Sequence, residues 1–181
     1  MRVVRAAEKA DAAEIAAIYD PLVLESHVSF EIEPPGPEEM GRRLDVGSKT
    51  HPWVVMVDGP DLIGYAYAGR HRIRPGYTWS VETSVYVAPR SRGQGVGKEL
   101  YSSLTRQCRE WGYVSAFAGI ALPNAASERL HESSGFVQIA VFPRVGFKAG
   151  RWWDVGWWYL SLSDESSASP APPGPPTILH R

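Results

Sequence analysis

Residues 90–98 of the chain read RSRGQGVGK, in which three glycines at alternate positions lie between arginines and a lysine. The stretch follows residues 79–89, a segment rich in β-forming residues that ends at a proline. After it, apolar residues recur every four positions from residue 96 to residue 108, which predicts an amphipathic helix. Glycines in such a turn let the backbone approach a ligand closely, and the first N–H groups of the helix attract an anion. The sequence therefore predicts a phosphate-binding turn between a strand and a helix.

Two common phosphate-binding motifs do not fit this stretch. A Walker loop, G-x-x-x-x-G-K-[S/T], would need glycine at Arg92 and serine or threonine at Glu99. A dinucleotide-binding fingerprint, G-x-G-x-x-G from Gly93, would need glycine at Lys98. The pattern that fits is R-x-x-G-x-G, which starts at Arg92. From these residues alone, a glycine-rich surface turn without a ligand stays an alternative.

Strand and helix patterns alternate through the rest of the chain, which favours one mixed α+β domain over residues 1–162. The turn signal DGPD separates two apolar runs that predict a hairpin. We expect one helix to be capped by Asp11, with Glu14 in its first turn, and another to end at Gly135. The predicted strands are 3–5, 53–57, 62–69, 79–89, 114–120, 137–142 and 153–161, and the predicted helices are the one after Asp11, 37–44, 96–108 and 125–134.

Composition excludes several classes of function. The chain has 19 basic and 20 acidic residues, whereas nucleic-acid-binding proteins usually carry a basic excess. It has no run of about 18 apolar residues, and its acidic N-terminal region does not fit a secretory signal. We therefore expect a cytoplasmic protein that binds neither nucleic acid nor membrane. The single cysteine, Cys108, is expected in the core. Residues 163–181 hold five of the 15 prolines and predict a disordered tail.

A second segment, NAASERLHESSGF at residues 124–136, follows later in the chain. Together with the R-x-x-G-x-G turn, it resembles the GNAT N-acetyltransferases, in which such a turn binds the pyrophosphate of coenzyme A. The segments GYAYAG, YTWSVETSVYV, GIALPN and VGFKAGRWWDVGWWYL are similar to the phosphinothricin acetyltransferase family, which includes methionine sulfoximine acetyltransferases. The resemblance covers nearly all of residues 1–162. It implies the GNAT fold, with a central, mostly antiparallel sheet flanked by helices.

The resemblance also implies the reaction and the partners. Members of this family transfer an acetyl group from acetyl-CoA to the α-amino group of a small amino acid or analogue, such as phosphinothricin, methionine sulfoximine or methionine sulfone. No metal takes part, and relatives are homodimers, so we expect a homodimer here. Four of the seven tryptophans lie in RWWDVGWWYL, and core packing or a subunit interface is the expected explanation for them.

For the cofactor, the resemblance implies a site with three parts. Backbone groups of the strand before the turn would pair with pantetheine, the turn would hold the pyrophosphate, and later polar side chains would complete the site. Backbone donors at a strand edge suit amides, and N–H groups at a turn suit phosphates. The implied residues are Val85, Tyr86, Val87, Arg92, Gly93, Gln94, Gly95, Val96, Gly97, Lys98, Asn124 and Ser133.

Two residues are implied to be catalytic. Glu82, in the segment SVET, matches a strand glutamate of the family and would take the proton of the incoming ammonium group, directly or through water. His131 stands where many GNAT enzymes place a tyrosine that protonates the departing thiolate, and the phosphinothricin family also carries histidine there. From the residues alone, Glu82 could be a solvated side chain on a strand. His131 could only orient the cofactor, or lie on a helix surface.

Arginines at positions 70, 72 and 74 lead into a Pro-Gly turn. If the preceding strand continued, alternation would place all three on one side. Guanidinium groups suit carboxylate, phosphinate or sulfoximine oxygens, although an ordinary charged strand end also explains them. The resemblance places the substrate loop here and an aromatic wall earlier in the chain. The implied substrate-binding residues are Phe30, Arg72, Arg74, Pro75, Gly76, Tyr77 and Glu82.

Two other functions stay open at this point. The chain could acetylate a different amine, such as a polyamine or a protein N-terminus, or it could bind an acyl-CoA without catalysis. Arginines that bind acids argue against a polycationic substrate. The presence of both Glu82 and His131 argues against a binding protein without activity.

Overall fold

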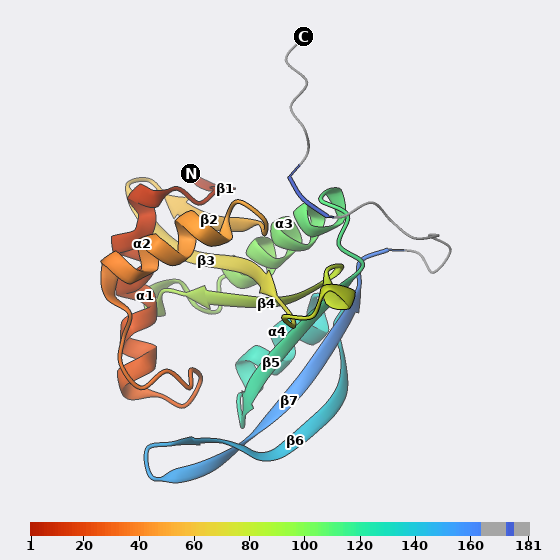
Figure 1. The fold of residues 1–181 in the computed structure, drawn as a ribbon. Helices are drawn as coiled ribbons and strands as arrows, with labels where there is room; N and C mark the ends of the chain where they lie inside the picture. The colour runs from red at the N-terminus through yellow and green to blue at the C-terminus, as the bar shows by residue number, and fades with distance from the viewer. Residues whose placement is uncertain (164–172, 176–181) are drawn as a thin grey trace.

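The computed structural model describes residues 1–163 and 173–175, so most of the predicted tail, 163–181, lies outside the described residues. Within the described residues, seven strands form one sheet and four α-helices pack against it (Figure 1). The strands are β1 (Arg2–Ala6), β2 (Trp53–Asp58), β3 (Asp61–Arg70), β4 (Ser80–Val87), β5 (Ser115–Leu122), β6 (Val137–Lys148) and β7 (Arg151–Ser161). The helices are α1 (Ala12–Glu25), α2 (Gly36–Gly47), α3 (Val96–Glu110) and α4 (Ala125–Ser133), with short 3-10 turns η1 (Lys9–Asp11), η2 (Pro75–Tyr77) and η3 (Pro89–Ser91).

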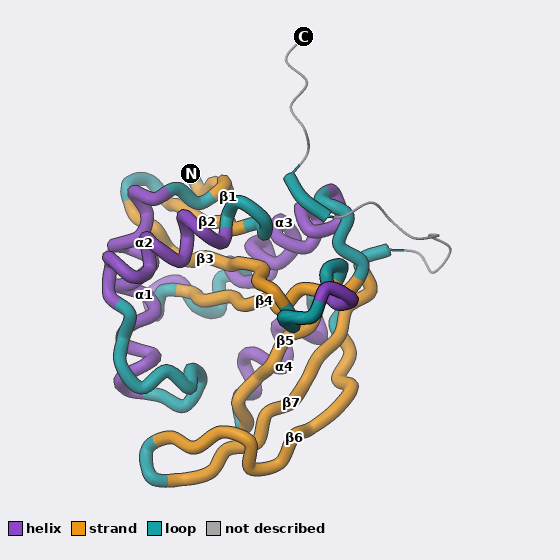
Figure 2. Tube along the Cα trace, viewed as in Figure 1, coloured by secondary structure: helices purple, strands orange, loops and turns teal. Residues whose placement is uncertain are grey.

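The sheet opens at its centre. The strand order is β1-β2-β3-β4-β5-β7-β6, and neighbours run antiparallel except β4 and β5, which run parallel. The pairing of β4 with β5 covers only residues 80–82 and 115–117. Beyond Glu82 and Phe117 both strands continue without pairing to each other, and they diverge in the tube view (Figure 2). The result is a wedge between two strands of one sheet.

Each face of the sheet has its own core. On one face, α3 and α4 cover a cluster that includes Tyr101 and Trp158, both at most 1% exposed. Cys108 belongs to this cluster, as expected, and burial raises the pKa of its thiol to about 12. On the other face, α1 and α2 cover a cluster that includes Ile15 and Tyr65. The wedge therefore connects two layers that the sheet otherwise separates.

Register assigns Glu82 to one of these faces. Residues paired across neighbouring strands point to the same side, so Glu82 shares its face with Gly69 on β3, Phe117 on β5 and Tyr159 on β7. Tyr65 lies on that face too, four residues before Gly69, and it belongs to the cluster beneath α1 and α2. The candidate catalytic carboxylate therefore lies on the α1–α2 face of the sheet.

The mixed α+β class and the mostly antiparallel sheet are confirmed, and most predicted elements lie within a few residues of their expected bounds. The hairpin near the C-terminal end is longer than predicted, because β6 runs on to Lys148 and β7 begins at Arg151. In the described ranges, 1–163 and 173–175, no helix is long and apolar enough to cross a membrane.

Asp11 is the N-cap residue of α1, as predicted, but its side chain does not form the capping hydrogen bond. Its carboxylate instead accepts two hydrogen bonds of 2.7 Å from Arg5 and one from the backbone N–H of Glu8. Glu14 accepts a hydrogen bond from the backbone N–H of Leu62 instead of closing a capping box. The carboxylate of Asp11 therefore pairs with Arg5, and that of Glu14 binds the backbone of β3. Helix propensity is a local property, so it could not predict these two partners.

The hairpin of β6 and β7 at the edge of the sheet carries exposed apolar side chains on both of its sides. Seven large apolar side chains of the β6–β7 hairpin are between 44% and 57% exposed. They are Val137, Ile139, Val141, Phe142, Val145, Phe147 and Trp152. A long apolar strand at the edge of a sheet is a surface that proteins usually cover.

Candidate active site

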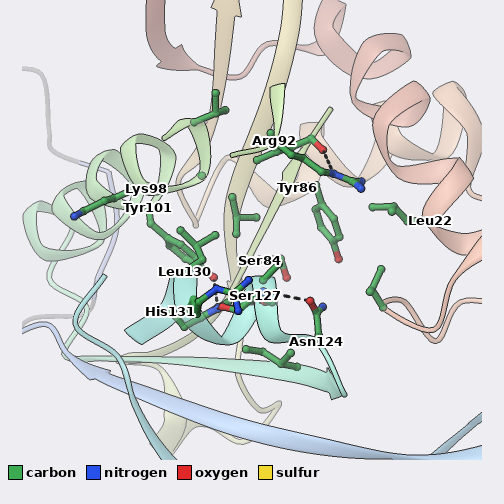
Figure 3. Close-up of a pocket in the computed structure, with 18 of the residues that line it drawn as sticks. Leu22, Ser84, Tyr86, Arg92, Lys98, Tyr101, Asn124, Ser127, Leu130 and His131 are labelled. Carbon is green, nitrogen blue, oxygen red and sulfur yellow. Dashed lines mark hydrogen bonds between the residues drawn. The ribbon is translucent and has the colours of Figure 1, made fainter. Parts of the chain in front are cut away.

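The wedge holds a cavity of about 640 Å³. Its walls come from residues 83–87 of β4, residues 119–121 of β5, the turn before α3, and α4, and Leu22 closes it from α1 (Figure 3). Residues of both faces of β4 line it, because every residue from 83 to 87 contributes to the wall. A long ligand can therefore reach from the α3–α4 side of the sheet to the α1–α2 side.

The glycine-rich turn forms one end of this cavity. Gly93 and Gly95 have φ angles of +72° and +83°, a region that favours glycine, and Gly95 is the N-cap residue of α3. The N–H groups in the first turn of α3 have no carbonyl partner within the helix. Arg92, Lys98 and Arg129 add positive charge to the wall. This end has the donors and the charge that suit a phosphate-bearing ligand.

The edge of β4 forms a second part of the wall. Val85, Tyr86 and Val87 line the cavity, and their backbone has no strand partner on the β5 side within the described residues. Asn124 lines the cavity too, and its side chain caps α4 by accepting a hydrogen bond from the backbone N–H of Ser127 at 3.2 Å. An extended ligand with amide groups can therefore lie along β4.

Gly97 lies in the first turn of α3, and it allows α3 and α4 to approach each other. A Cβ at this position would lie 2.9 Å from a methyl carbon of Leu130, closer than carbon atoms normally come. Val96 and Gly97 both line the cavity. The third glycine of the turn therefore serves the packing of the two helices that form the wall.

Two residues expected at this site lie outside the cavity wall. Gln94 accepts hydrogen bonds from Arg2 at both its backbone carbonyl and its side chain. Ser133 donates a hydrogen bond of 3.0 Å to the backbone carbonyl of Leu130. Ser127, six residues before Ser133 on α4, lines the cavity instead.

His131 is buried in the wall of the cavity, at 4% exposure. Its Nδ1 lies 2.7 Å from the carbonyl oxygen of Ser127, which can only accept, so Nδ1 carries the proton. Nε2 therefore accepts the hydrogen bond from the Tyr101 hydroxyl at 2.7 Å (Figure 3). Burial lowers the pKa of His131 and favours the neutral ring. The arrangement supports an orienting role for His131 more than proton donation, and Tyr101, which the sequence did not indicate, joins the wall.

A second cavity, of about 290 Å³, lies on the α1–α2 side. Val28, Gly119 and Ala121 line both cavities, so the two adjoin. The other lining residues are all apolar: Phe30, Phe142, Val145, Val155 and Trp157. The sequence indicated Phe30 as part of an apolar wall, whereas it indicated only packing for the tryptophans. A cavity of this kind suits the aliphatic part of a small ligand.

Glu82 lies at the apex of the wedge, at the last paired position of β4 and β5. Its Oε1 accepts hydrogen bonds from Nδ1 of His71 at 3.0 Å and from Nη1 of Arg72 at 3.1 Å. We call these three residues the charged cluster. The His71 ring stacks on Phe117 at 4.4 Å between centroids, and the Arg72 guanidinium lies 5.8 Å from the Trp157 ring. Trp157 thus joins the charged cluster to the second cavity, and His71 is a neighbour of Glu82 that the sequence did not indicate.

The three alternating arginines do not share one side, because β3 ends at Arg70. Arg70 pairs with Val81, which belongs to the core beneath α3 and α4, so Arg70 points away from the face of Glu82. Arg72 follows the end of the strand and turns toward Glu82. The expectation of a common face fails because the strand stops before the second arginine.

The rest of the predicted substrate loop is exposed. Arg74 precedes η2, whose residues Pro75, Gly76 and Tyr77 are exposed as well. Tyr77 approaches the charged cluster, with its ring edge-on to that of His71 at 5.9 Å between centroids. The structure therefore brings Tyr77 to the cluster and leaves Arg74, Pro75 and Gly76 at the surface.

The loop between α1 and α2 forms the outer wall of the second cavity, and the β6–β7 hairpin holds it in place. Lys148 is 8% exposed, and its Nζ donates to the carbonyl oxygens of Val23 and Ser29, both at 2.6 Å. Burial lowers the pKa of Lys148. His27 stacks on Trp153 with 3.9 Å between ring centroids. These contacts fix the loop that carries Phe30.

Known proteins match this arrangement along most of the chain. A family model for an acetyltransferase (GNAT) domain matches residues 4–157. A phosphinothricin N-acetyltransferase of Streptomyces coelicolor is 38% identical over 163 residues, which cover 88% of this chain and 95% of that protein. An L-methionine sulfoximine/L-methionine sulfone acetyltransferase of Salmonella typhimurium is 36% identical, over 91% of this chain and 96% of that protein. A phosphinothricin acetyltransferase of Sinorhizobium meliloti, solved in complex with acetyl-CoA, matches with a TM-score of 0.90 at 34% identity, over 99% of this chain and 98% of that one.

Proposed function

The chain belongs to the acetyltransferase (GNAT) family, and we propose that it transfers the acetyl group of acetyl-CoA to the α-amino group of a small amino acid or amino-acid analogue. It is an N-acetyltransferase, with acetyl-CoA as its cosubstrate. The names of the relatives give phosphinothricin, methionine sulfoximine and methionine sulfone as the first acceptors to consider. We assign the activity to a single domain, residues 1–162.

The wedge fits acetyl-CoA, which supplies an activated acetyl thioester when it is bound. The turn with Gly93 and Gly95 would hold the pyrophosphate, because it combines free N–H groups with nearby basic side chains. Residues 85–87 would pair with the pantetheine amides, because this edge of β4 has no neighbouring strand. Asn124, on the opposite wall, would contact the same arm.

The second cavity and the charged cluster fit the acceptor. An aliphatic chain would lie against Phe30 and Trp157. An acidic group would bind Arg72, whose side chain is 49% exposed and has N–H groups beyond the one that donates to Glu82. Tyr77 would border the same site. The acceptor would therefore be a small molecule with one apolar and one anionic part.

One observation carries the proposal: Glu82 lies at the apex of the wedge, close to residues of both cavity walls. Its neighbour Thr83 lines the first cavity, and Trp157, which contacts its partner Arg72, lines the second. An ammonium group must lose a proton before it can attack a thioester, so a basic group is needed where the two ligands meet. We assign this requirement to the charged cluster around Glu82. His131, with both ring nitrogens already hydrogen-bonded, would orient Tyr101 in the wall.

We also propose that the protein is a homodimer in which the exposed apolar side chains of edge strand β6 are covered. The support is the row of exposed apolar side chains on this edge strand, and the presence of Phe142 and Val145 of β6 in the wall of the second cavity. Ile139→Glu would place a charge among these side chains and should give a monomer by light scattering. A wild-type monomer at micromolar concentration would contradict the proposal. The cytoplasmic location stays a prediction.

Thiol release tests the reaction directly. Purified protein is mixed with acetyl-CoA and a panel of phosphinothricin, methionine sulfoximine, methionine sulfone, common amino acids and spermidine. We expect release of coenzyme A with one or more amino-acid acceptors, and none with spermidine. Release with spermidine alone would favour the polyamine alternative. Binding of acetyl-CoA without release for any amine would favour a binding protein.

A further inference from the structure

His71 has no role in the chemistry described so far, yet it is a direct hydrogen-bond partner of Glu82. Its side chain is 12% exposed, whereas that of Glu82 is 38% exposed. A carboxylate oxygen can only accept, so the contact of 3.0 Å between Nδ1 and Oε1 places the ring proton on Nδ1. Nε2 therefore carries a lone pair. An imidazole fixed in this way by a carboxylate is a base with one free nitrogen.

Aromatic rings hold the imidazole in position. Phe117 stacks on it at 4.4 Å with 17° between the ring planes. Tyr77 and Trp157 meet it edge-on, at 5.9 Å and 6.2 Å between centroids. These three rings come from η2, β5 and β7, so the ring of His71 cannot turn without moving a neighbour. Within the described residues, no group forms a hydrogen bond with Nε2.

The charged groups around His71 leave Nε2 as the free basic atom. Glu82 faces the ring from β4, Arg72 lies beside it, and Tyr77 faces it from η2, whereas β5 and β7 present uncharged rings. Both donors of the cluster bind the same oxygen, Oε1 of Glu82, so that this oxygen already accepts two hydrogen bonds. An imidazole ring is also intrinsically a stronger base than a carboxylate.

We propose that His71 is the catalytic base, that its Nε2 takes the proton of the acceptor ammonium, and that Glu82 acts through His71. Glu82 would then hold the ring in one tautomer and pair with the imidazolium when it forms. This inference rests on the proposed function and deepens it, because it names the atom that meets the amine. It also gives a reason for the aromatic enclosure of the ring.

The step balances as follows in atoms and charge. One N–H bond of the ammonium breaks, and its proton moves to Nε2 of His71. The freed lone pair forms the N–C bond to the acetyl carbon, and the C–S bond of the thioester breaks. A second proton leaves the nitrogen and neutralises the thiolate, so the products are an amide and a thiol. The imidazolium then returns its proton to solvent.

Two substitutions separate a base from a structural residue. His71→Asn keeps an N–H donor near Oε1 of Glu82 but has no basic nitrogen. His71→Phe keeps a ring that can stack on Phe117. His51→Asn is the matched control, because His51 contacts Thr50 and Tyr113 and makes no hydrogen bond with Glu82. The readout is kcat and KM from thiol release between pH 5.5 and pH 9, with the full chain.

We expect both His71 variants to lose about 10²–10⁴-fold in kcat, the usual worth of a general base, with an unchanged KM for acetyl-CoA. The wild type should lose kcat as the pH falls, because a base must be unprotonated to act, and both variants should lack this acidic limb. His51→Asn should retain the wild-type rate and profile. A structural role alone would not remove the limb in a variant that still folds.

An His71→Asn enzyme within threefold of the wild-type kcat, with the acidic limb intact, would overturn the proposal and return proton removal to Glu82 itself or to water. The proposed function would survive that result. Thiol release by no amino acid in the wild type would remove both. If the variants do not fold, histidine ¹⁵N resonances of the wild type decide the matter, because an Nε2-protonated tautomer of His71 at neutral pH would also overturn the proposal.

Discussion

The two cavities that adjoin at the wedge are built in different ways. The first is formed largely by backbone: two glycines with positive φ, the first turn of α3, and the unpaired edge of β4. The second is formed by side chains from separate elements, among them Phe30 of the α1–α2 loop, Phe142 of β6 and Trp157 of β7. Backbone groups suit phosphates and amides, which are the same in every acetyl-CoA molecule. Side chains, in contrast, can be chosen to fit a particular acceptor. Recognition of the cosubstrate is therefore a local property, and recognition of the acceptor depends on tertiary contacts.

Two histidines, one in each region, differ in their free hydrogen-bonding capacity. On the cosubstrate side, both nitrogens of His131 are hydrogen-bonded within the protein. On the acceptor side, His71 has only Nδ1 engaged, by Glu82. The same residue type therefore fixes a wall in one region and offers a basic atom in the other.

The largest effect should come from Glu82→Gln, on the acceptor side. The amide keeps the shape of the side chain but cannot balance a positive charge, so we expect kcat to fall by about 10²–10⁴-fold at neutral pH. Part of the loss should return at high pH, because more of the acceptor amine is then neutral. The KM for acetyl-CoA should not change, since this region does not bind the cosubstrate.

The matched control is Glu39→Gln, which makes the same change in a surface ion pair on α2. It should leave kcat at the wild-type value. A Glu82→Gln enzyme with the wild-type rate and pH profile would show that the charged cluster is not needed for proton removal, and the functional division between the two regions would fail.

Gly95→Val should disturb the cosubstrate side alone. A β-branched residue at a φ angle of +83° costs roughly 1–3 kcal/mol and displaces the start of α3, so the Kd of acetyl-CoA should rise about 10–100-fold. Gly59→Val is the control, because Gly59 has a φ angle of +61° in the β2–β3 turn, away from both cavities. Calorimetric titration should show a weaker Kd in Gly95→Val only, although urea unfolding shows both destabilised. An equal loss of affinity in both variants would mean that global strain, not the turn, weakens binding.

Two substitutions, Arg72→Ala and Arg74→Ala, test which arginine of the predicted substrate loop binds the acceptor. Arg72 lies in the charged cluster, whereas Arg74 is exposed at the start of η2. Loss of one charge-assisted contact is worth about 1.5–3 kcal/mol, so Arg72→Ala should lower kcat/KM for an acidic acceptor by roughly 10–100-fold. Arg74→Ala should change it little. Equal losses in steady-state assays would mean that the exposed turn moves onto the acceptor when it binds.

The smallest effect concerns His131 and the pH dependence of stability. Burial lowers its pKa in the folded state, so the unfolded chain binds a proton that the folded chain does not. Its contribution to stability is therefore complete above about pH 6.5 and is lost as the pH falls through that value. His131→Gln should make the free energy of unfolding less steep between pH 7 and pH 5, by up to about 1.4 kcal/mol per pH unit.

Urea unfolding at several pH values measures this slope. His51 is the comparison, because burial and then the charge of Arg70 lower its pKa as well. His51→Asn should remove only its own share of the slope. An unchanged slope in His131→Gln would mean that the His131 ring takes up a proton in the folded state, contrary to the hydrogen bonds that it forms.

Local patterns predicted most of the fold. The glycine-rich turn, the amphipathic α3 and the β2–β3 hairpin are each encoded within a short segment, and the structure confirms them. The order of the strands and the short parallel pairing of β4 with β5 did not follow, because they depend on contacts between segments far apart in the chain. The N-cap position of Asp11 was predicted correctly, but the lack of a side-chain capping hydrogen bond there has the same cause, since Arg5 binds its carboxylate.

The candidate site likewise has residues that a local pattern can indicate and residues that only long-range contacts bring together. Most residues of the cosubstrate wall lie in two segments, 83–101 and 119–131, so a resemblance could assign many of them. His71, Tyr101 and Trp157 were not indicated, because folding alone brings them to the cavities or to Glu82. The position of His71, directly after the strand that pairs with the strand of Glu82, was the one local signal that could have found it. A buried lysine such as Lys148, held by two carbonyl groups, leaves no pattern in a sequence.

The short pairing of β4 with β5 makes the sheet an incomplete structure that a ligand finishes. A molecule that binds only the folded chain stabilises it by RT ln(1 + [L]/Kd), which is about 2.7 kcal/mol when the free ligand is at a hundred times its Kd. The free energy of folding of this protein therefore depends on the acetyl-CoA concentration around it. Backbone amides beyond the apex of the wedge should exchange with deuterium faster in the free chain than in the bound one. The supply of the cosubstrate would in this way set the rigidity of the protein as well as its rate.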